Sequence, residues 1–355
     1  MKHITYLKHD YDIFIGLDVD KKSYSFTVKD HDIMNTSKRI PASPEYFYNY
    51  IRNNYSNKRV ICAYETGPTG FGLHDYLKEQ NVTCLVTSPL SIKKAVNEKV
   101  KNNRIDSENI ARQLRAGELE SIRVPNNAYR ELRHLARTRE IYVNNRKVTK
   151  QRIKSLLLHE SLYSLIKEPD ITWSQHYIKL LKELSCSPAV KNRMNMLLSD
   201  LEYNFRQIFN IYRTLKAFIK EHSEIEKHIN HLCSIPGIGI VTSVTVLANI
   251  GDPANLRNVR ELGGFTGLVP TEHSTGDNIN HGSITHFGNS ILRRMLIESA
   301  WIAIRNDTRL AQFYHRIRIK NSNKHGPRKA ITAVARKLTQ IIYCVLKEQR
   351  DYIPS

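Results

Sequence analysis

Three acidic residues in the first third of the chain stand where strands and a helix could bring them together. Asp18 lies near the end of an apolar, strand-like run at residues 13–19. Glu65 ends a second buried run, and Asp106 opens a helical segment. A carboxylate among buried strands is costly unless another group pairs with it. The placement of these acids therefore calls for a partner of opposite charge.

A divalent cation is the partner that suits three carboxylates. A bound cation removes the repulsion between clustered acids, and ligand sets made of oxygen favour Mg²⁺ or Mn²⁺ over zinc. One or two such ions orient a phosphodiester and activate an oxygen nucleophile. We therefore expect Asp18, Glu65 and Asp106 to be metal ligands, although Glu65 and Asp106 taken singly could equally be helix caps.

A loop rich in hydroxyl groups and glycine, at residues 267–289, is a second place for chemistry. Ser274 and Thr275 precede Gly276, and Arg293 and Arg294 follow on a predicted helix. A hydroxyl beside guanidinium groups can attack a phosphodiester, because the arginines stabilise the charge that develops. By residue type alone an ordinary Ser-Thr-Gly turn is the commoner explanation.

The stretch "SIPGIG", at residues 234–239, lies between two apolar helical segments. Gly237 and Gly239 allow close approach of the backbone, and the free N–H groups at the start of the second helix can hold an anion. This pattern predicts a helix-hairpin-helix that contacts a nucleic-acid phosphate without reading bases. The alternative is a plain tight turn.

The elements that would position the acids form an α/β pattern over residues 12–118. Strand patterns at 13–19, 24–30 and 33–40 are followed by a helix at 43–54 and a strand at 59–65. A helix at 69–80, a strand at 82–87 and a segment that is helical at both ends, at 88–119, complete the region. Three consecutive strands followed by alternating helices and strands predict a mixed sheet.

Beyond Pro125 the apolar spacing becomes helical. Two long runs, about 129–165 and 190–229, flank an insert with prolines near residues 169–188. They predict either an antiparallel hairpin or an interchain coiled coil that serves dimerisation, with an ordinary helical core as the alternative. The remaining residues are mainly helical, so we expect domains at 1–124, 125–230 and 231–355.

The overall charge indicates a polyanionic partner. The 355 residues include 54 Lys and Arg against 34 Asp and Glu, which gives a net charge of +20. Nucleic acid is the first candidate for such a chain. Five scattered cysteines without a CxxC motif indicate a reduced, cytoplasmic protein. We expect neither a secretory leader nor a membrane span, because no run of about 18 apolar residues occurs.

A series of short motifs resembles one known family. In chain order they are "IGLDVDKKS", "AYETGPTG", "KNNRIDSENIARQLRAGEL", "IPGIG", "GFTGLVPTEHSTG", "ITHFGNSILRRMLIESAW" and "AVARKL". Together they resemble the DEDD-type transposases of insertion sequences, the group that includes the pilin-gene invertase and the bridge-RNA-guided recombinases. The resemblance extends over nearly the whole chain.

The resemblance implies a fold and a mechanism. It implies a ribonuclease-H/RuvC-like first domain, a helical coiled-coil middle and a carboxyl-terminal transposase domain. It makes Asp18, Glu65 and Asp106 three of four family acids and Ser274 the nucleophile, with Thr275 the less favoured hydroxyl. Family members rejoin DNA through a covalent phosphoserine, act as tetramers that share active sites, and use a structured RNA to pair with target and donor DNA. The expected location is the bacterial cytoplasm, in association with the nucleoid.

One position departs from the family pattern. Where the family has an acid three residues before the last aspartate, this chain has Asn103. An amide lacks the charge that attracts a cation, although its oxygen can still coordinate one. The chain is then either a weakened copy or one changed to trap a complex. Two other functions remain: a Holliday-junction-type nuclease whose acids direct water, and a transposase remnant that binds RNA and DNA without chemistry.

Overall fold

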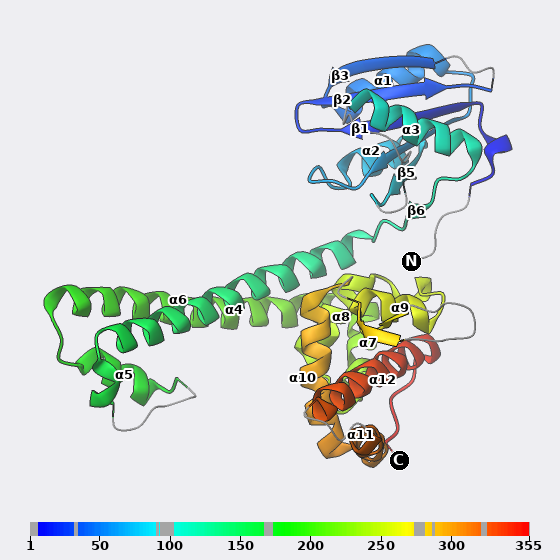
Figure 1. The fold of residues 1–355 in the computed structure, drawn as a ribbon. Helices are drawn as coiled ribbons and strands as arrows, with labels where there is room; N and C mark the ends of the chain where they lie inside the picture. The colour runs from blue at the N-terminus through cyan, green and yellow to red at the C-terminus, as the bar shows by residue number, and fades with distance from the viewer. Residues whose placement is uncertain are drawn as a thin grey trace. The chain divides into compact units, whose positions relative to one another are not determined.

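The computed structural model describes residues 6–31, 35–89, 92, 103–166, 173–272, 281–285, 288–320 and 325–354. The chain divides into two compact units, Met1–Pro125 and Asn126–Ser355 (Figure 1). Each unit has its own buried apolar clusters. The further division that we expected near residue 230 stays a prediction.

The first unit is built on one mixed β-sheet. Its strands lie in the order β3-β2-β1-β4-β5-β6, in which β1, β4 and β5 are parallel and the other neighbours are antiparallel. The bounds are β1 Ile13–Val19, β2 Ser23–Lys29, β3 Asn35–Pro41, β4 Val60–Glu65, β5 Thr83–Thr87 and β6 Ser121–Ile122. The predicted mixed α/β class is confirmed, and only the two-residue strand β6 was not expected.

Helices cover both faces of this sheet. Helix α1 (Pro44–Tyr55) and helix α2 (Gly72–Glu79) pack on one face, and helix α3 (Asn103–Ala116) packs on the other. Ser43 caps α1 by accepting a hydrogen bond from the Tyr46 N–H, as its position before the helix predicted. Side chains of a strand alternate between faces, so β1 contributes Ile15 and Leu17 to one core and Phe14 to the other.

The second unit is almost entirely helical. Its helices are α4 Asn127–His159, α5 Gln175–Glu183, α6 Pro188–Glu221, α7 Ser223–Cys233, α8 Ile240–Ile250, α9 Val259–Thr266, α10 Ser290–Asn306, α11 Thr308–Lys320 and α12 Gly326–Glu348. Its described residues also form the hairpin of β7 (Pro270–Glu272) and β8 (His281–Ile284) and two 3₁₀ turns, at Leu162–Leu165 and Pro253–Asn255.

The long helices α4 and α6 lie side by side and antiparallel (Figure 1). Their outer halves form an apolar cluster with α5, to which α4 contributes Ile153 and Leu157 and α6 contributes Leu198. Their inner ends enter the main core, where Leu132 of α4 and Leu215 of α6 are buried. This is the antiparallel hairpin, one of the two arrangements that we expected for these runs.

The main core of the second unit surrounds α8. Residues 243–248 of this helix are all buried, and helices α7, α9, α10, α11 and α12 contribute to the same apolar cluster. A helix buried on all sides must be apolar on all sides, which explains its sequence "IVTSVTVLANI". In the described parts of the chain, no helix combines the length and the apolar character needed to cross a membrane.

Candidate catalytic site

Asp18 and Glu65 lie next to one another at the carboxyl ends of neighbouring parallel strands. Leu17 of β1 is opposite Tyr64 of β4, so the residues that follow them continue the same register. Glu65 is in turn opposite Thr87 of β5. Both carboxylates are half-buried, which limits their exposure to water and favours pairing with a cation.

The two acids also point to the same face of the sheet. Phe14 of β1 and Ile61 and Ala63 of β4 belong to the apolar cluster beneath α3. Because strand side chains alternate between faces, Asp18 and Glu65 continue these rows on the side that α3 covers. The sheet therefore directs both carboxylates toward the helix that carries Asp106.

Gly16 brings α3 very close to β1. A Cβ atom at Gly16 would lie 2.3 Å from the Ser107 carbonyl oxygen and 2.3 Å from the Ala111 backbone nitrogen. The Ser107 hydroxyl is also 3.0 Å from the Thr27 hydroxyl of β2. Only glycine permits this approach. The contact holds α3 against β1 at Ser107, the residue that follows Asp106.

The direction of α3 places its first turn at the carboxyl end of β1. Leu114, near the end of the helix, packs in the cluster that contains Phe14 at the start of the strand. Ser107 contacts the middle of the strand at Gly16. The helix therefore runs antiparallel to β1, and half-buried Asp106 lies toward the edge where Asp18 stands.

Asn103 is the first residue of α3, one turn before Asp106. Residues three apart on a helix share a face, so the backbone gives positions 103 and 106 a common direction. The Asn103 side chain lies outside the described residues.

The donor groups at this edge fit a hard divalent cation. Carboxylate oxygens come from two adjacent strand ends and from the first turn of the covering helix. Such ligand sets select Mg²⁺ or Mn²⁺. Among the residues that the structure describes, no three His, Cys, Asp or Glu side chains are close enough together to hold a metal ion as they stand. The strand register therefore places Asp18 beside Glu65. Asp106 lies toward the same edge of the sheet, but in the described residues the three side chains do not form a metal site as they stand.

Ser274 and Thr275 lie outside the described residues, as does the rest of 273–280. The structure describes the strands on either side, β7 and β8, which pair antiparallel. The Thr285 N–H donates to the Val269 carbonyl at 2.8 Å, and the Asn289 N–H donates to the Phe265 carbonyl at 2.8 Å. The residues that carry the candidate nucleophile therefore connect the two paired strands of this hairpin.

The two predicted arginines contact other parts of the second unit. The Arg293 guanidinium donates to the Thr266 carbonyl, the last of α9, at 3.1 Å. Arg294 pairs at 2.8 Å with Glu140 of α4, whose side chain is buried. Removing one partner of such a pair is costly, so Arg294 has a structural role that its sequence position did not indicate. Binding of nucleic acid by either arginine stays a prediction.

The glycines of "SIPGIG" differ in their surroundings. The Ile238 N–H donates to the Ile235 carbonyl, and Gly237 has a φ of +83°, as a type II turn requires. A Cβ at Gly237 would lie 2.3 Å from the Ser299 carbonyl oxygen, so this glycine permits close packing against α10. Gly239 precedes α8 and has open space around its Cα. Of the two, Gly239 has the geometry that approach by a phosphate requires.

Comparison with known proteins identifies the family. Residues 15–160 match a family model described as Transposase, for the DEDD domain of the IS110 group. Residues 229–315 match the model described as Transposase IS116/IS110/IS902 family. The chain belongs to this IS110/IS116/IS902 transposase family. Its first unit is accordingly a ribonuclease-H-like DEDD domain, and a mostly helical transposase domain follows it.

Several relatives support this assignment. The transposase for insertion sequence element IS1111A of Coxiella burnetii is 27% identical over 256 residues, which are 71% of this chain and 68% of that protein. The transposase-designated protein y4qE of Sinorhizobium fredii is 27% identical over 83% of this chain and 77% of its own. The pilin gene-inverting protein of Moraxella bovis is 30% identical over 54% of this chain and 58% of its own.

Family membership establishes the broad activity. The protein is an IS110-family transposase, an enzyme of DNA recombination whose partner is DNA. Its DEDD domain implies a divalent metal ion, and the oxygen donors at the edge of the sheet fit one.

Proposed function

We propose that this transposase is an RNA-guided DNA recombinase that cuts and rejoins strands through a phosphoserine. The observation that supports the proposal most directly is the register of β1 and β4, which sets Asp18 beside Glu65. Both face the helix that carries Asp106. Acids so arranged at one sheet edge have the chemistry needed to position a phosphodiester.

Each acid of the edge has a role in this proposal. Asp18, Glu65 and Asp106 hold Mg²⁺, for which Mn²⁺ can substitute, and Asn103 offers an amide oxygen where the family has a fourth carboxylate. The ion, when bound, polarises the scissile phosphate. The half-buried carboxylates would fix the position of that ion at the edge of the sheet, and the ion would in turn orient the phosphate.

Ser274 supplies the nucleophile. Its Oγ forms an ester bond with phosphorus while the bond from phosphorus to a deoxyribose oxygen breaks, and the serine proton passes to that oxygen, which leaves as a hydroxyl. Attack by the hydroxyl of a second strand reverses these steps and restores the serine. Since each ester replaces another, the exchange needs no ATP. Arg293 and Arg294, which lie on α10 and follow Ser274 in the chain, are the proposed groups that stabilise the phosphorane charge.

A structured guide RNA is the proposed second partner. The net charge of +20 suits a protein that holds more than one polyanion. The family resemblance adds the class of RNA, one that pairs with both donor and target DNA. The Moraxella bovis relative is named for gene inversion, which is also a rejoining of DNA strands. In the predicted helix-hairpin-helix, Gly239 is proposed to contact the backbone of nucleic acid, and Gly237 to form the turn that precedes it.

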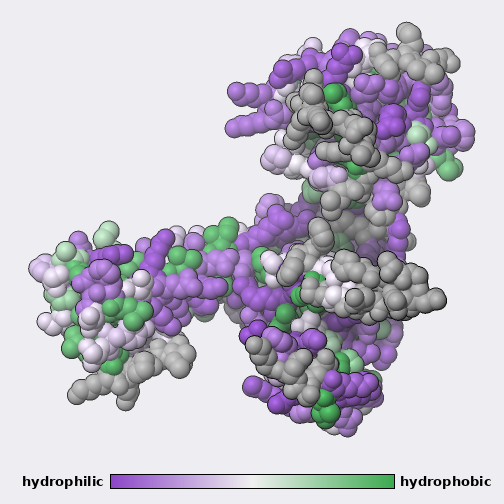
Figure 2. Space-filling model, viewed as in Figure 1, coloured by the Kyte–Doolittle hydropathy of each residue, from purple (hydrophilic) through white to green (hydrophobic). Residues whose placement is uncertain are grey.

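The arm of α4 and α6 is proposed to join subunits as a dimer or tetramer. It exposes large apolar side chains, shown among polar ones in Figure 2. On α4 these include Ile141 and Val148, and on α6 they include Met196 and Tyr203. Each pair is seven residues apart and so lies on one face of its helix. Exposed apolar rows of this spacing are typical of surfaces that bind a second helix.

Two other functions make different demands on these residues. A Holliday-junction-type nuclease would use the acids to direct water and would not depend on Ser274. A remnant that only binds RNA and DNA would retain neither reaction, and Asn103 is the feature that favours it. Ser274 therefore separates the recombinase from the nuclease.

The test is Ser274→Ala in a chain that also carries Asn103→Asp. We expect the parent to form a covalent adduct with donor DNA and the alanine variant to form none, while both bind RNA equally. Thr275→Ala is the matched control and should retain the adduct. Cleavage without an adduct in the Ser274 variant would favour the nuclease, and an adduct mapped by peptide mass to Thr275 would move the nucleophile by one residue.

A further inference from the structure

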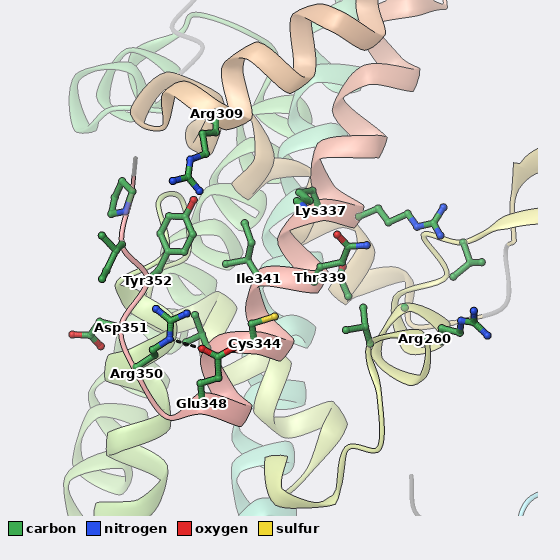
Figure 3. Close-up of a pocket in the computed structure, with 18 residues that line it drawn as sticks. Arg260, Arg309, Lys337, Thr339, Ile341, Cys344, Glu348, Arg350, Asp351 and Tyr352 are labelled. Atoms are coloured by element: carbon green, nitrogen blue, oxygen red, sulfur yellow. Dashed lines mark hydrogen bonds and ion pairs between the residues drawn. The ribbon is translucent and has the colours of Figure 1, made fainter.

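A pocket of about 950 Å³ lies in the second unit, and none of the residues assigned so far to catalysis or to nucleic-acid binding lines it (Figure 3). Its walls come from α9, from Arg309 of α11, from the carboxyl-terminal half of α12 and from residues 350–354 that follow α12. The volume is at the upper end of the range, about 300–1,000 Å³, that is typical of ligand sites.

Four basic side chains surround this pocket. Arg260 of α9, Arg309 of α11, and Arg336 and Lys337 of α12 all line it. In the described part of the second unit, none of these four forms an ion pair with a carboxylate.

The two acids of the wall offset only part of this positive charge. Glu348 is paired with Arg350, and Asp351 is 2.8 Å from the His231 ring nitrogen. Figure 3 shows the Glu348–Arg350 pair at one end of the pocket, with Arg309 beside Tyr352, Lys337 on α12 and Arg260 on the opposite side, on α9. The four cations therefore favour an anionic ligand.

The rest of the lining is apolar. Val259, Val269, Ile341, Val345 and Ile353 contribute to it, together with the exposed thiol of Cys344. A small inorganic anion would make no use of such a surface. A ligand that carries phosphates and flat, weakly polar rings would use both parts of the lining.

The wall formed by the last residues is firmly attached. The Tyr352 N–H donates to the Ser234 hydroxyl at 2.7 Å, and the Tyr352 hydroxyl donates to Asp307 at 2.6 Å. Burial and this hydrogen bond raise the pKa of Tyr352 to about 12, so the hydroxyl stays a donor at neutral pH. Lys227 also donates to the Gln349 side chain at 2.8 Å. A pocket with fixed walls loses little entropy when a ligand binds.

We propose that this pocket holds an unpaired stretch of the DNA substrate, with phosphates on the cations and a base against the apolar wall. The inference rests on DNA being the partner of the proposed recombinase, and it deepens that function by assigning a place for a strand opened during exchange. A duplex keeps its bases stacked inside a stiff rod, so it would use the charges and leave the apolar lining empty.

Cys344 reports directly on occupancy of the pocket. The full-length protein, without Mg²⁺, is alkylated with iodoacetamide in the presence of an oligodeoxythymidine, its duplex with oligodeoxyadenosine, or an oligouridine. We expect the single strand of DNA to slow alkylation of Cys344 by roughly tenfold, which is the size of effect that stacking of one base against a side chain produces. Cys233, which is also exposed, is the internal control and should react at an unchanged rate.

A pair of charge variants tests the cations. Arg336→Gln with Lys337→Gln should lower affinity for the single strand by roughly tenfold or more and should abolish protection of Cys344. Arg305→Gln with Arg328→Gln removes the same charge from exposed positions of α10 and α12 outside the pocket, and should change affinity by about twofold at most.

Several results would overturn the assignment. These are equal losses in the two charge variants, protection of Cys344 by the duplex as strongly as by the single strand, or protection by oligouridine alone. None of them would affect the adduct test at Ser274, because this experiment measures binding without strand chemistry. Conversely, loss of the adduct would leave the alkylation result unchanged.

Discussion

At the scale of single residues, position 103 decides how negative the acidic edge is. The backbone sets Asn103 one turn before Asp106 on α3, and that helix packs over the face to which Asp18 and Glu65 point. An amide at this position removes one charge from the proposed set of four ligands. A weaker attraction for Mg²⁺ follows, with little change in shape.

We therefore expect Asn103→Asp to raise Mg²⁺-dependent strand exchange by roughly tenfold or more, which is about 1.4 kcal/mol in the barrier. The measurement is the rate on a matched donor and target with guide RNA, at several Mg²⁺ concentrations. Asn102→Asp adds the same charge at the neighbouring position and should leave the rate near that of the parent. Equal rates for Asn103→Asp and the parent would remove position 103 from the metal site.

At the scale of elements, the α4–α6 pair is both part of a core and a free surface. Its inner ends are buried with α8, and its outer ends have their own cluster with α5. Met196 is 65% exposed on α6, whereas Met194 and Leu198, two residues away on either side and on the opposite face of the helix, are buried. Exposure of so large an apolar side chain beside a complete core favours a contact with another helix.

Met196→Glu should therefore weaken self-association by roughly tenfold or more, because a charge would be buried at the contact. Asn195→Glu adds the same charge one position away, about 100° around the helix, and should leave association unchanged. Analytical ultracentrifugation over a range of concentrations measures both. The melting temperatures of both variants should match that of the parent, since both positions are exposed in the single chain. A parent protein that is monomeric would contradict the proposed role of the arm.

At the scale of the whole molecule, the net charge of +20 should dominate the energetics of DNA binding. Neutralising phosphates releases counterions, so log affinity should fall linearly with log salt, with a slope of about −0.9 for each duplex phosphate contacted. A protein that makes six or more such contacts loses roughly a thousandfold in affinity between about 50 and 200 mM salt.

We expect a loss of that size for a random-sequence duplex, measured by fluorescence anisotropy without Mg²⁺. Ser274→Ala should give the same slope, because it changes one neutral side chain and no phosphate contact that depends on charge. An affinity that does not vary with salt would exclude the polyanion-binding character inferred from composition.

Features that depend on local periodicity could be predicted from the sequence alone. The apolar run of β1 and the three- and four-residue spacing of α4 and α6 are properties of consecutive residues, so the strands, the long helices and the mixed sheet were predictable. The ends of buried strands are also local, which is why Asp18 and Glu65 could be paired before the register of β1 and β4 was known.

Contacts between residues far apart in the chain became apparent only in the tertiary structure. The sequence gives no indication that Gly16 must be glycine because α3 crosses β1, that Arg294 neutralises Glu140, or that Gly237 packs on Ser299. The cationic pocket likewise requires α9, α12 and the residues after α12 to meet. Such contacts arise when elements pack in three dimensions, and no short-range pattern of residue types records which side chains then become neighbours.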